Sequence, residues 1–301
     1  MNSKKQIKVK LNLKLIQAKI NSHINNIQEI RAGNINTKYL LVTENNNKMV
    51  LKIYTDRSYI SPIFSGVNRA KREFTILKYC ERNDILAPKP IALFNNNVVM
   101  SFVEGKLIKE AINVQSRIFN LIMQWLTLFH SSLCVDRVPL SKPIDGVFRT
   151  LRYALAQSND AILSDLYSTL CKSSFCPSTQ QKITHGDVTL NNWIISEDGK
   201  VYGLDFEFSG KNDVLFDIGM LISSLWERDN FNKHFYSHCC SEVFKKYEKF
   251  VPINSRSIAF YVILSMILMA YNVPDKTRHK NLLLQAKELL SKYISNHDKI
   301  S

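Results

Sequence analysis

Two short polar motifs restrict the fold of this 301-residue chain more than any other feature of its sequence. The first is HGDVTLNN at residues 185–192, and the second is LDFEF at residues 204–208. Both adjoin short apolar runs of β-strand character (QKITHGD, NWIIS and KVYGLDF), whereas the surrounding sequence has helical periodicity. The sequence therefore predicts polar loops that short strands support within a mainly helical region.

The side chains of these motifs suit phosphoryl transfer. That reaction needs a carboxylate beside the acceptor hydroxyl and oxygen ligands for metal ions that bridge the phosphates. We expect Asp187 to accept or orient the acceptor proton, and Asn192 and Asp205 to bind Mg²⁺, a hard cation that prefers oxygen ligands. Either motif alone could be a surface turn with satisfied polar groups, but the two together fit that explanation poorly.

The motifs resemble the H-G-D-x-x-x-x-N and D-x-[DE] elements of the aminoglycoside phosphotransferase and choline kinase superfamily. The resemblance implies an α+β, bilobal, protein-kinase-like fold. A small, β-rich, nucleotide-binding N-lobe would span residues 1–104, and a larger, mostly helical C-lobe would span residues 105–301. It also implies a kinase that moves the γ-phosphoryl group of ATP, or of another nucleoside triphosphate, to an alcohol group with Mg²⁺ as cofactor. Glu207 would assist a metal or only solvate the site.

The resemblance covers roughly residues 26–226 and implies further nucleotide contacts. Gly33 lies in RAGNINTKYLLV, which is similar to the family's nucleotide-covering hairpin. Lys52 in MVLKIY resembles the lysine that grips the α- and β-phosphates, and Glu73 in AKREF resembles the helix glutamate that pairs with it. The segment VVMSFVEGK is similar to the interlobe segment, whose backbone groups would pair with adenine; the candidates are Ser101, Phe102 and Val103.

Three further residues are expected to have structural roles. His130 stands in WLTLFHSSL, which is similar to the family's L-x-x-L-H helix, and it is expected to be structural. His185 is expected to bond backbone near the polar loop and not to act as an acid or base. Asp217 in FDIGMLISSLW resembles the aspartate that holds the catalytic loop through backbone bonds.

Hydrophobic periodicity predicts the order of the remaining elements. The N-lobe should contain a three-stranded meander, two helices and one hairpin. The C-lobe should contain a helix over residues 116–133 and a buried helix over residues 258–273, whose apolar run is shorter than the roughly 20 residues needed to cross a bilayer. The predicted N-lobe elements are helices over 11–23 and 68–82, and strands over 27–33, 37–43, 49–54, 91–94 and 98–104.

The charge distribution and the cysteines indicate which partners and which cellular location to expect. Lys and Arg exceed Asp and Glu by 14, and residues 1–60 hold 11 basic and 3 acidic residues, a distribution that favours anionic partners such as nucleotides, phosphorylated lipids or RNA. The six cysteines form no C-x-x-C pair, and no apolar run follows the charged amino terminus, so a cytoplasmic location is expected. Weak contact of the basic end with the anionic inner face of a membrane stays open. The lysines in question are Lys4, Lys5, Lys8, Lys10, Lys14 and Lys19.

The class of acceptor is predicted from two features: where the chain departs from the pattern of choline and ethanolamine kinases, and how its charge is distributed. The chain lacks the N-H-F and E-W elements that follow D-F-E in choline and ethanolamine kinases, and residues 227–301 contain 12 basic and 7 acidic residues. A polycationic antibiotic is therefore disfavoured. A small neutral or anionic sugar, glycan or lipid headgroup is favoured, and choline or ethanolamine stays open.

Two other functions are weighed against this one. An atypical serine/threonine protein kinase would share the fold, but the chain has glycine instead of arginine after the motif histidine, D-F-E instead of D-F-G, and no A-P-E segment. A non-catalytic module that binds nucleotides or nucleic acid would have no need of a carboxylate at the acceptor position.

Overall fold

A computed structural model of the chain describes residues 12–30, 36–54, 69–131, 160–172, 182–228, 233–249, 251, 253–272 and 275–293. Gly33 and the lysines at positions 4, 5, 8 and 10, for which the sequence predicted roles, lie outside these residues.

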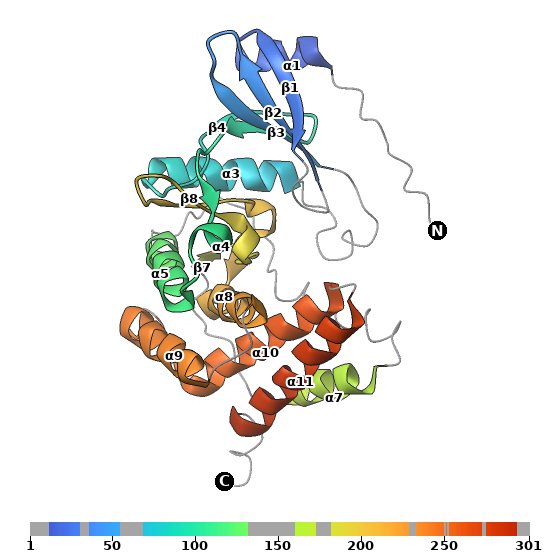
Figure 1. Cartoon of the computed structure of the whole chain (residues 1–301), viewed down its shortest axis with the longest axis vertical. Helices are drawn as coiled ribbons and strands as arrows, with labels where there is room; N and C mark the ends of the chain where they lie inside the picture. Colours follow the sequence, from blue (N-terminus) through green and yellow to red (C-terminus); the bar gives the residue numbers. More distant parts are fainter. Residues whose placement is uncertain are drawn as a thin grey trace.

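A five-stranded antiparallel sheet lies at one end of the molecule, above α3 and the helices of the other end (Figure 1). The predicted meander is confirmed as β1–β2–β3, and the predicted hairpin adds β5 and β4 to its edge. Asn95 and Asn96 both have positive φ, 44° and 60°, which matches a two-residue hairpin turn built from asparagines. The strands are β1 (Ile24–Ile30), β2 (Thr37–Thr43), β3 (Lys48–Ile53), β4 (Pro90–Phe94) and β5 (Asn97–Ser101).

Two helices accompany the sheet. Helix α1 (Leu13–Ile20) is shorter than the predicted 11–23, because Asn12 caps its start and Asn21 adopts a left-handed conformation at its end. Its Ile16 packs in a small cluster with the strand residues Leu41, Leu51, Ile53, Ala92, Phe94 and Val99. Helix α3 (Arg69–Arg82) buries Ile76 and Leu77 in a second, larger cluster that also contains Val98 and Met100 of β5. The sheet therefore has two apolar faces, each with its own helix.

The larger part of the molecule is mainly helical, with short strands where the sequence predicted them. The three predicted runs form β7, β8 and β9, and the strands pair as two small sheets, β10–β7 and β6–β8–β9. Strand β10 was not predicted, because its sequence GKN has neither apolar alternation nor β-branched residues. The elements are β6 (Lys106–Leu107), α4 (Ile108–Ala111), α5 (Gln115–Ser131), α7 (Ala161–Lys172), β7 (Lys182–Thr184), η1 (Leu190–Asn192), β8 (Trp193–Ile195), β9 (Val201–Gly203), η2 (Phe206–Phe208), β10 (Gly210–Asn212), α8 (Val214–Arg228), α9 (Lys233–Tyr247), α10 (Ser255–Asn272) and α11 (Lys276–Tyr293).

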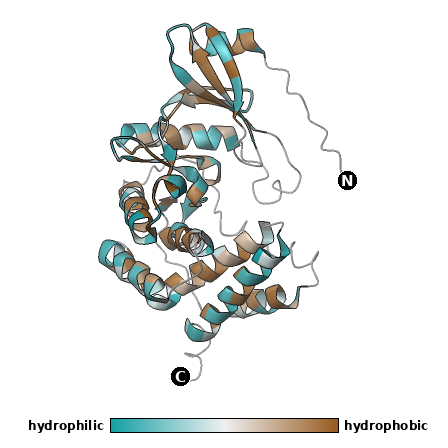
Figure 2. Ribbon diagram, in the orientation of Figure 1, coloured by the Kyte–Doolittle hydropathy of each residue, from teal (hydrophilic) through white to brown (hydrophobic). Residues whose placement is uncertain are grey.

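Helix α10 is the buried helix that the sequence predicted over 258–273. Figure 2 shows mainly brown and pale residues along it, as expected for a helix that packs on several sides. It crosses α8 at Gly219, where an added Cβ would lie 2.5 Å from the carbonyl of Tyr261, so this glycine permits close contact of the two helices. Among the described residues, no helix has the length and apolar character required to cross a bilayer.

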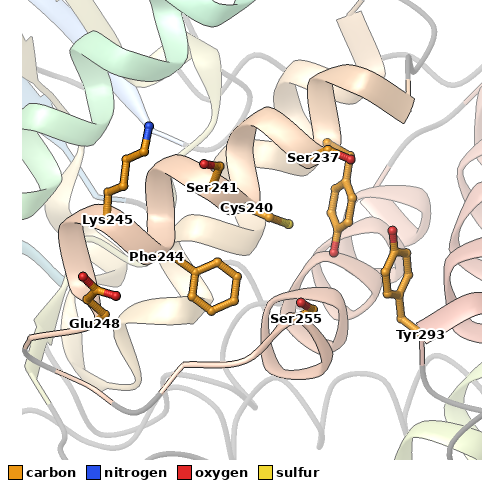
Figure 3. A pocket seen from close by; sticks show the side chains of 9 residues that line it. Ser237, Cys240, Ser241, Phe244, Lys245, Glu248, Ser255 and Tyr293 are labelled. Atoms are coloured by element: carbon orange, nitrogen blue, oxygen red, sulfur yellow. The ribbon is translucent and has the colours of Figure 1, made fainter.

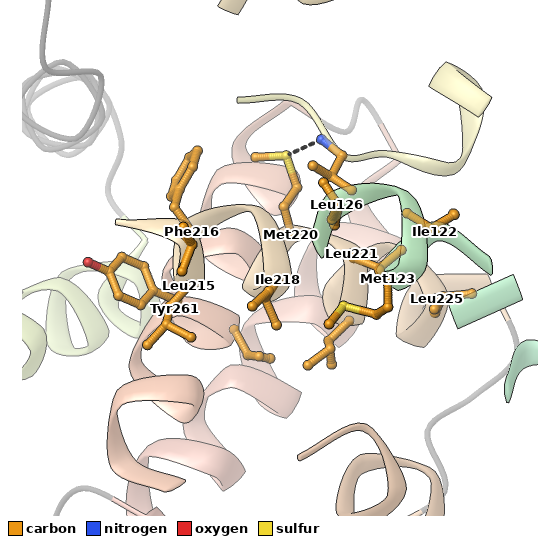
Figure 4. Packing of buried hydrophobic residues seen from close by; sticks show 14 of the residues in the cluster. Ile122, Met123, Leu126, Leu215, Phe216, Ile218, Met220, Leu221, Leu225 and Tyr261 are labelled. Atoms are coloured by element: carbon orange, nitrogen blue, oxygen red, sulfur yellow. Dashed lines mark hydrogen bonds between the residues drawn. The ribbon is translucent and has the colours of Figure 1, made fainter. Parts of the chain in front are cut away.

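Side chains from α5 and α8 interdigitate in the centre of this region (Figure 4). Met220 of α8 also accepts a hydrogen bond from the backbone N–H of Val188 at its sulfur, 3.2 Å away, so the apolar core directly supports the polar loop after β7. The same large cluster extends from α3 and β5 through α5 and α8 to α11. The α+β architecture with a β-rich part and a helical part is thus confirmed, while the boundary at residues 104/105 stays a prediction.

Candidate active site

Lys52 is buried at the junction of the sheet and the helical part. Its ammonium lies 2.6 Å from Glu73 Oε2 on α3 and 2.6 Å from Asp205 Oδ1, which follows β9. Only 2 % of its side chain is exposed. Burial alone would lower the pKa of Lys52, but Asp205, Glu207 and Glu73 outweigh that effect and hold the pKa well above its usual range. Lys52 is therefore a fixed positive charge that links three segments of the chain.

Each carboxylate oxygen of Asp205 accepts a hydrogen bond from one lysine ammonium group. Lys52 bonds Oδ1, and Lys38 of β2 lies 3.3 Å from Oδ2. The backbone of Asp205 is left-handed, with φ 66° and ψ 64°, an uncommon conformation for a residue with a Cβ. Burial would raise the pKa of Asp205, but the two lysines hold it well below its usual range. The carboxylate is thus ionised and held where two strands of the sheet meet the helical part.

Glu207 is buried two residues beyond Asp205. Its Oε2 accepts hydrogen bonds from the side-chain amide of Asn36 at 2.8 Å and from Arg69 Nη1 at 3.1 Å. Lys52 Nζ lies 3.8 Å from the same oxygen. Burial raises the pKa of Glu207 to about 7, against the opposing effect of Lys52. Glu207 therefore belongs to the same charged cluster as Lys52 but has its own set of donors.

Tyr54 closes one side of this cluster. Its hydroxyl donates a hydrogen bond to Glu73 Oε2. The ammonium of Lys52 lies 4.9 Å from the centre of its ring, and the guanidinium of Arg69 lies 5.6 Å from it, distances at which a cation is attracted by an aromatic face. Tyr54 therefore contacts one acidic and two basic members of the cluster.

Asp187 and Asn192 form a second, connected group. The side-chain amide of Asn192 donates to the backbone carbonyl of Asp187 and to its Oδ2, both at 2.8 Å. Because both of those atoms are acceptors, the amide nitrogen must face them, which leaves Asn192 Oδ1 as the atom able to bind a cation. The backbone carbonyl of Asn192 accepts from Leu204 N–H at 2.9 Å, so this loop adjoins Asp205. Burial and the charge of Asp205 raise the pKa of Asp187 to about 6.

Asp217 holds the loop that carries Asp187. Its carboxylate accepts the backbone N–H of His185 at 2.6 Å and of Gly186 at 2.9 Å, and it pairs with His130 Nε2 at 2.9 Å. Gly186 has φ +83°, and a Cβ there would lie 2.2 Å from the carbonyl oxygen of Phe208, so no side chain fits. His185 Nδ1 accepts the backbone N–H of Asp187 at 3.3 Å, so the contacts of Asp217, His130 and His185 fit their predicted structural roles.

In the predicted interlobe segment, two of the three backbone N–H groups donate hydrogen bonds within the protein. Ser101 N–H donates to Lys89 O at 2.9 Å, and Phe102 N–H donates to Lys48 O at 3.1 Å. Within the described part of the chain, Val103 N–H has no such partner. If this segment binds a nucleotide base, Val103 is the residue whose N–H can donate to it.

Comparison with known proteins identifies the family. Residues 26–236 match the phosphotransferase enzyme family, which is more than half of the chain. The chain belongs to the phosphotransferase enzyme family. A search of curated protein sequences found no significant match.

Solved structures similar to this family member share its fold over nearly the whole chain. A choline kinase of Streptococcus pneumoniae, LicA, is 18% identical with a TM-score of 0.65, covering 93% of this chain and 99% of its own. An amicoumacin kinase solved with AMP-PNP and Ca²⁺ is 15% identical with a TM-score of 0.66, covering 95% of both chains. An ethanolamine kinase of Plasmodium vivax is 17% identical with a TM-score of 0.61, covering 95% of this chain and 86% of its own. The predicted superfamily and protein-kinase-like fold are thus confirmed.

The carboxylates of this phosphotransferase suit a divalent cation. One oxygen each of Glu73, Asp205 and Glu207 lies within 4.8 Å of the others, and the backbone carbonyl of Asn192 accepts from Leu204, the residue before Asp205. All are oxygen donors, which is the chemistry that Mg²⁺ and Ca²⁺ prefer. Of the predicted ligands, Asp205 and Glu207 belong to this acidic group and Asn192 adjoins it through the Leu204 hydrogen bond.

Four side chains of the charged cluster around Lys52 were not predicted from the sequence. Arg69 precedes Glu73 by one helical turn, so helical spacing could have placed both on one face of α3. Lys38 is the direct cross-strand partner of Lys52, but that register follows only from the hairpin geometry. The other two residues that the sequence analysis left without a role are Asn36 and Tyr54.

A pocket of about 450 Å³ lies elsewhere on the phosphotransferase, among α9, the start of α10 and the end of α11 (Figure 3). Phe244 and Cys240 contribute apolar side chains to its lining, and Lys245 and Glu248 contribute charged ones. None of the residues predicted for catalysis lines it. The charged cluster around Lys52, and not this pocket, is the candidate active site.

Proposed function

We propose that this phosphotransferase transfers the γ-phosphoryl group of ATP, or of another nucleoside triphosphate, to a hydroxyl group of a small molecule with the help of Mg²⁺. The observation that supports the proposal best is the convergence of Lys52, Asp205 and Asp187 from three separate segments on one junction. A lysine that binds phosphates, carboxylates for a cation and a half-buried carboxylate beside them are the parts that the reaction needs.

Asp187 would orient the acceptor and take its proton. With a pKa of about 6 the carboxyl is largely ionised at pH 7, so it can accept a hydrogen bond from an incoming hydroxyl. Asn192 holds that carboxylate in place through its amide. Asp217 fixes the loop behind it, so the acceptor position is rigid before substrate arrives.

Lys52 would bond the α- and β-phosphates while Glu73 keeps its side chain extended into the site. Asp205, Glu207 and Asn192 would hold the cation, and Val103 would donate to the base in the segment that also contains Ser101 and Phe102. When bound, a divalent cation neutralises charge on the phosphates during transfer. These residues position the nucleotide and neutralise the charge of its phosphates, which is most of what catalysis of phosphoryl transfer requires.

The acceptor we favour is a neutral or anionic hydroxyl compound such as a sugar, a glycan or a lipid headgroup. Support comes from the formal net charge of +14 and from the excess of basic residues over residues 227–301. Choline and ethanolamine are the competing acceptors, since similar structures include kinases named for them. Only a direct comparison of acceptors separates the two groups.

The test is a screen of hydroxyl compounds for ADP release in the presence of Mg²⁺. The panel contains sugars, sugar phosphates, choline, ethanolamine and kanamycin. We expect one neutral or anionic compound to stimulate release in the parent protein, and Asp187→Asn to remove that stimulation. Asp198→Asn, the same change at an exposed residue paired with Lys200 in the β8–β9 turn, is the matched control.

Each other result identifies a different function. Release that is best with kanamycin overturns the charge argument. Transfer of radiolabelled γ-phosphate from ATP to the protein itself, without any acceptor, indicates a protein kinase. Nucleotide binding without transfer to any compound indicates a binding module.

A further inference from the structure

Lys38 is a second lysine at the candidate site, and neither the sequence motifs nor the family match assigns it a role. It stands on β2 directly opposite Lys52 on β3, and antiparallel partners project their side chains from the same face of a sheet. Its ammonium lies 3.3 Å from Asp205 Oδ2, while Lys52 lies 2.6 Å from Oδ1. The two lysines therefore share one carboxylate.

The two lysines differ in how firmly they are held. Lys52 is 2 % exposed and has Glu73 and Glu207 near it in addition to Asp205. Lys38 is 23 % exposed, and within the described residues Asp205 is its only acidic partner. An ammonium with one long, partly solvated contact can leave at little cost, because such ion pairs contribute about 1 kcal/mol or less. Lys38 is thus the movable charge of the pair.

Each oxygen of Asp205 bonds one ammonium group, so a cation that coordinates this carboxylate is repelled by both lysines. Moving one ammonium away relieves this repulsion, and Lys38 is the easier to displace. A metal–nucleotide complex also brings phosphate oxygens to the same junction, and these are strong acceptors for an ammonium. The displaced lysine therefore has a new partner within reach of its flexible side chain.

We propose that Lys38 is a second phosphate-binding lysine, which neutralises Asp205 before nucleotide binds and bonds the β- or γ-phosphate once a metal–nucleotide complex occupies that carboxylate. This inference rests on the proposed function. It has a consequence that a purely structural lysine would not have. Removing the charge of Lys38 strengthens the binding of a free cation but weakens the binding of the metal–nucleotide complex.

The experiment compares the parent protein with Lys38→Met, Lys38→Arg and Lys78→Met. Lys78 is an exposed lysine of α3 that contacts the ring of Phe74, so its substitution controls for loss of one charge in the same lobe. Three ligands are titrated: Mn²⁺ alone, Mg²⁺ with AMP-PNP, and AMP without metal. Binding is read by calorimetry, or by electron paramagnetic resonance for Mn²⁺, so no acceptor is needed.

In Lys38→Met we expect Mn²⁺ alone to bind about fivefold more tightly, as the loss of a partly exposed competing ion pair predicts. We expect Mg²⁺ with AMP-PNP to bind about tenfold or more weakly, because a charge-assisted bond to phosphate is lost. AMP should bind unchanged, since it lacks the β- and γ-phosphates. Lys38→Arg should restore most of the nucleotide affinity, and Lys78→Met should match the parent.

The inference is overturned if Lys38→Met binds Mg²⁺ with AMP-PNP as the parent does, or if it binds Mn²⁺ more weakly. A loss of AMP affinity of the same size would assign Lys38 a structural role and also overturn it. If the parent itself fails to bind Mg²⁺ with AMP-PNP, the proposed function falls as well. The two failures are therefore distinguishable.

Discussion

Single residues in the candidate site are held by opposite charges rather than by apolar packing. Lys52, Lys38 and Arg69 face Glu73, Asp205 and Glu207, so three positive side chains balance three carboxylates. Removing one partner from such a buried set leaves a charge unpaired, which costs far more than an exposed ion pair contributes. Substitutions here will therefore affect folding as well as binding, and each needs a binding measurement beside the activity measurement.

The metal assignment predicts a graded effect at two residues. Asp205→Ala should lower Mg²⁺-dependent binding of AMP-PNP by at least about 100-fold, because it removes a charged ligand, whereas Asn192→Ala removes a neutral one and should cost about tenfold. Raising Mg²⁺ should partly rescue Asn192→Ala. Calorimetric titration of AMP-PNP at several Mg²⁺ concentrations makes the comparison. Full affinity of Asp205→Ala at low Mg²⁺ would show that the cation binds elsewhere.

Sequence motifs located the part of the site that depends on local spacing. Asp187 with Asn192, and Asp205 with Glu207, are close in the chain, so their pattern predicted a shared role. Pairs that are distant in sequence, such as Asn36 with Glu207, depend on how two parts of the molecule meet, and no local pattern carries that information. Roles resting on the family resemblance, such as that of Val103, remain proposals.

Hydrophobic periodicity predicts the bounds of long elements well and the bounds of short elements poorly. Helix α5 was predicted to begin within one residue of its start, because its apolar positions repeat over several turns. Strand β5 ends at Ser101 rather than at Glu104, since its partner β3 begins at Lys48, which bonds Phe102, and no residue of β3 lies opposite Val103 or Glu104.

Contact between α8 and α10 depends on Gly219. Gly219→Ala should lower the free energy of unfolding by about 2 kcal/mol or more, because the new methyl group overlaps the Tyr261 backbone and the helices must separate. Gly199→Ala is the control: its Cβ would meet nothing within 4 Å, and only the positive φ of 79° costs about 1 kcal/mol. Denaturant unfolding followed by circular dichroism measures both. Equal losses in the two variants would contradict the packing argument.

His279 joins α11 to two other elements. Its Nδ1 faces the carbonyl of Ala270 at 2.9 Å and its Nε2 faces Asp160 Oδ2 at 3.0 Å, so only the doubly protonated ring can donate to both. The hydrogen bond to Asp160, the largest cause, and the one to Ala270 raise the pKa of His279. Its contribution to stability is therefore fully present below about pH 6.5 and is lost as pH rises through the raised pKa.

His279→Gln should accordingly destabilise the protein more at pH 6 than at pH 9. We expect a difference of about 0.5 kcal/mol between the two pH values, since the pair is partly exposed. Urea unfolding of parent and variant at both pH values gives the comparison. A variant whose deficit is the same at both, or larger at pH 9, would show that the charged ring does not stabilise the helix contact.

Among the described residues, the larger apolar cluster runs from α3 and β5 to α11. A smaller cluster lies between α1 and the sheet. The larger cluster thus contains residues from both predicted lobes. A bilobal protein of this kind should unfold as one cooperative unit.

Thermal unfolding tests that expectation. The three tryptophans stand at positions 125, 193 and 226, all in the helical part, whereas far-ultraviolet circular dichroism reports on both parts. The midpoints from tryptophan fluorescence and from circular dichroism should coincide within about 2 °C, the shift that a fraction of a kcal/mol would produce. An earlier transition seen only by circular dichroism would indicate that the sheet unfolds by itself.

The most direct test of the proposed function separates binding from chemistry at Asp187. For the parent and for Asp187→Asn, the affinity for Mg²⁺ with AMP-PNP and the rate of γ-phosphoryl transfer to the best acceptor are measured side by side. We predict a nucleotide affinity within about twofold of the parent and a transfer rate lower by about 10²- to 10⁴-fold, as the loss of a general base implies. Transfer within a few-fold of the parent rate would contradict the assignment of Asp187 and, with it, the proposed mechanism.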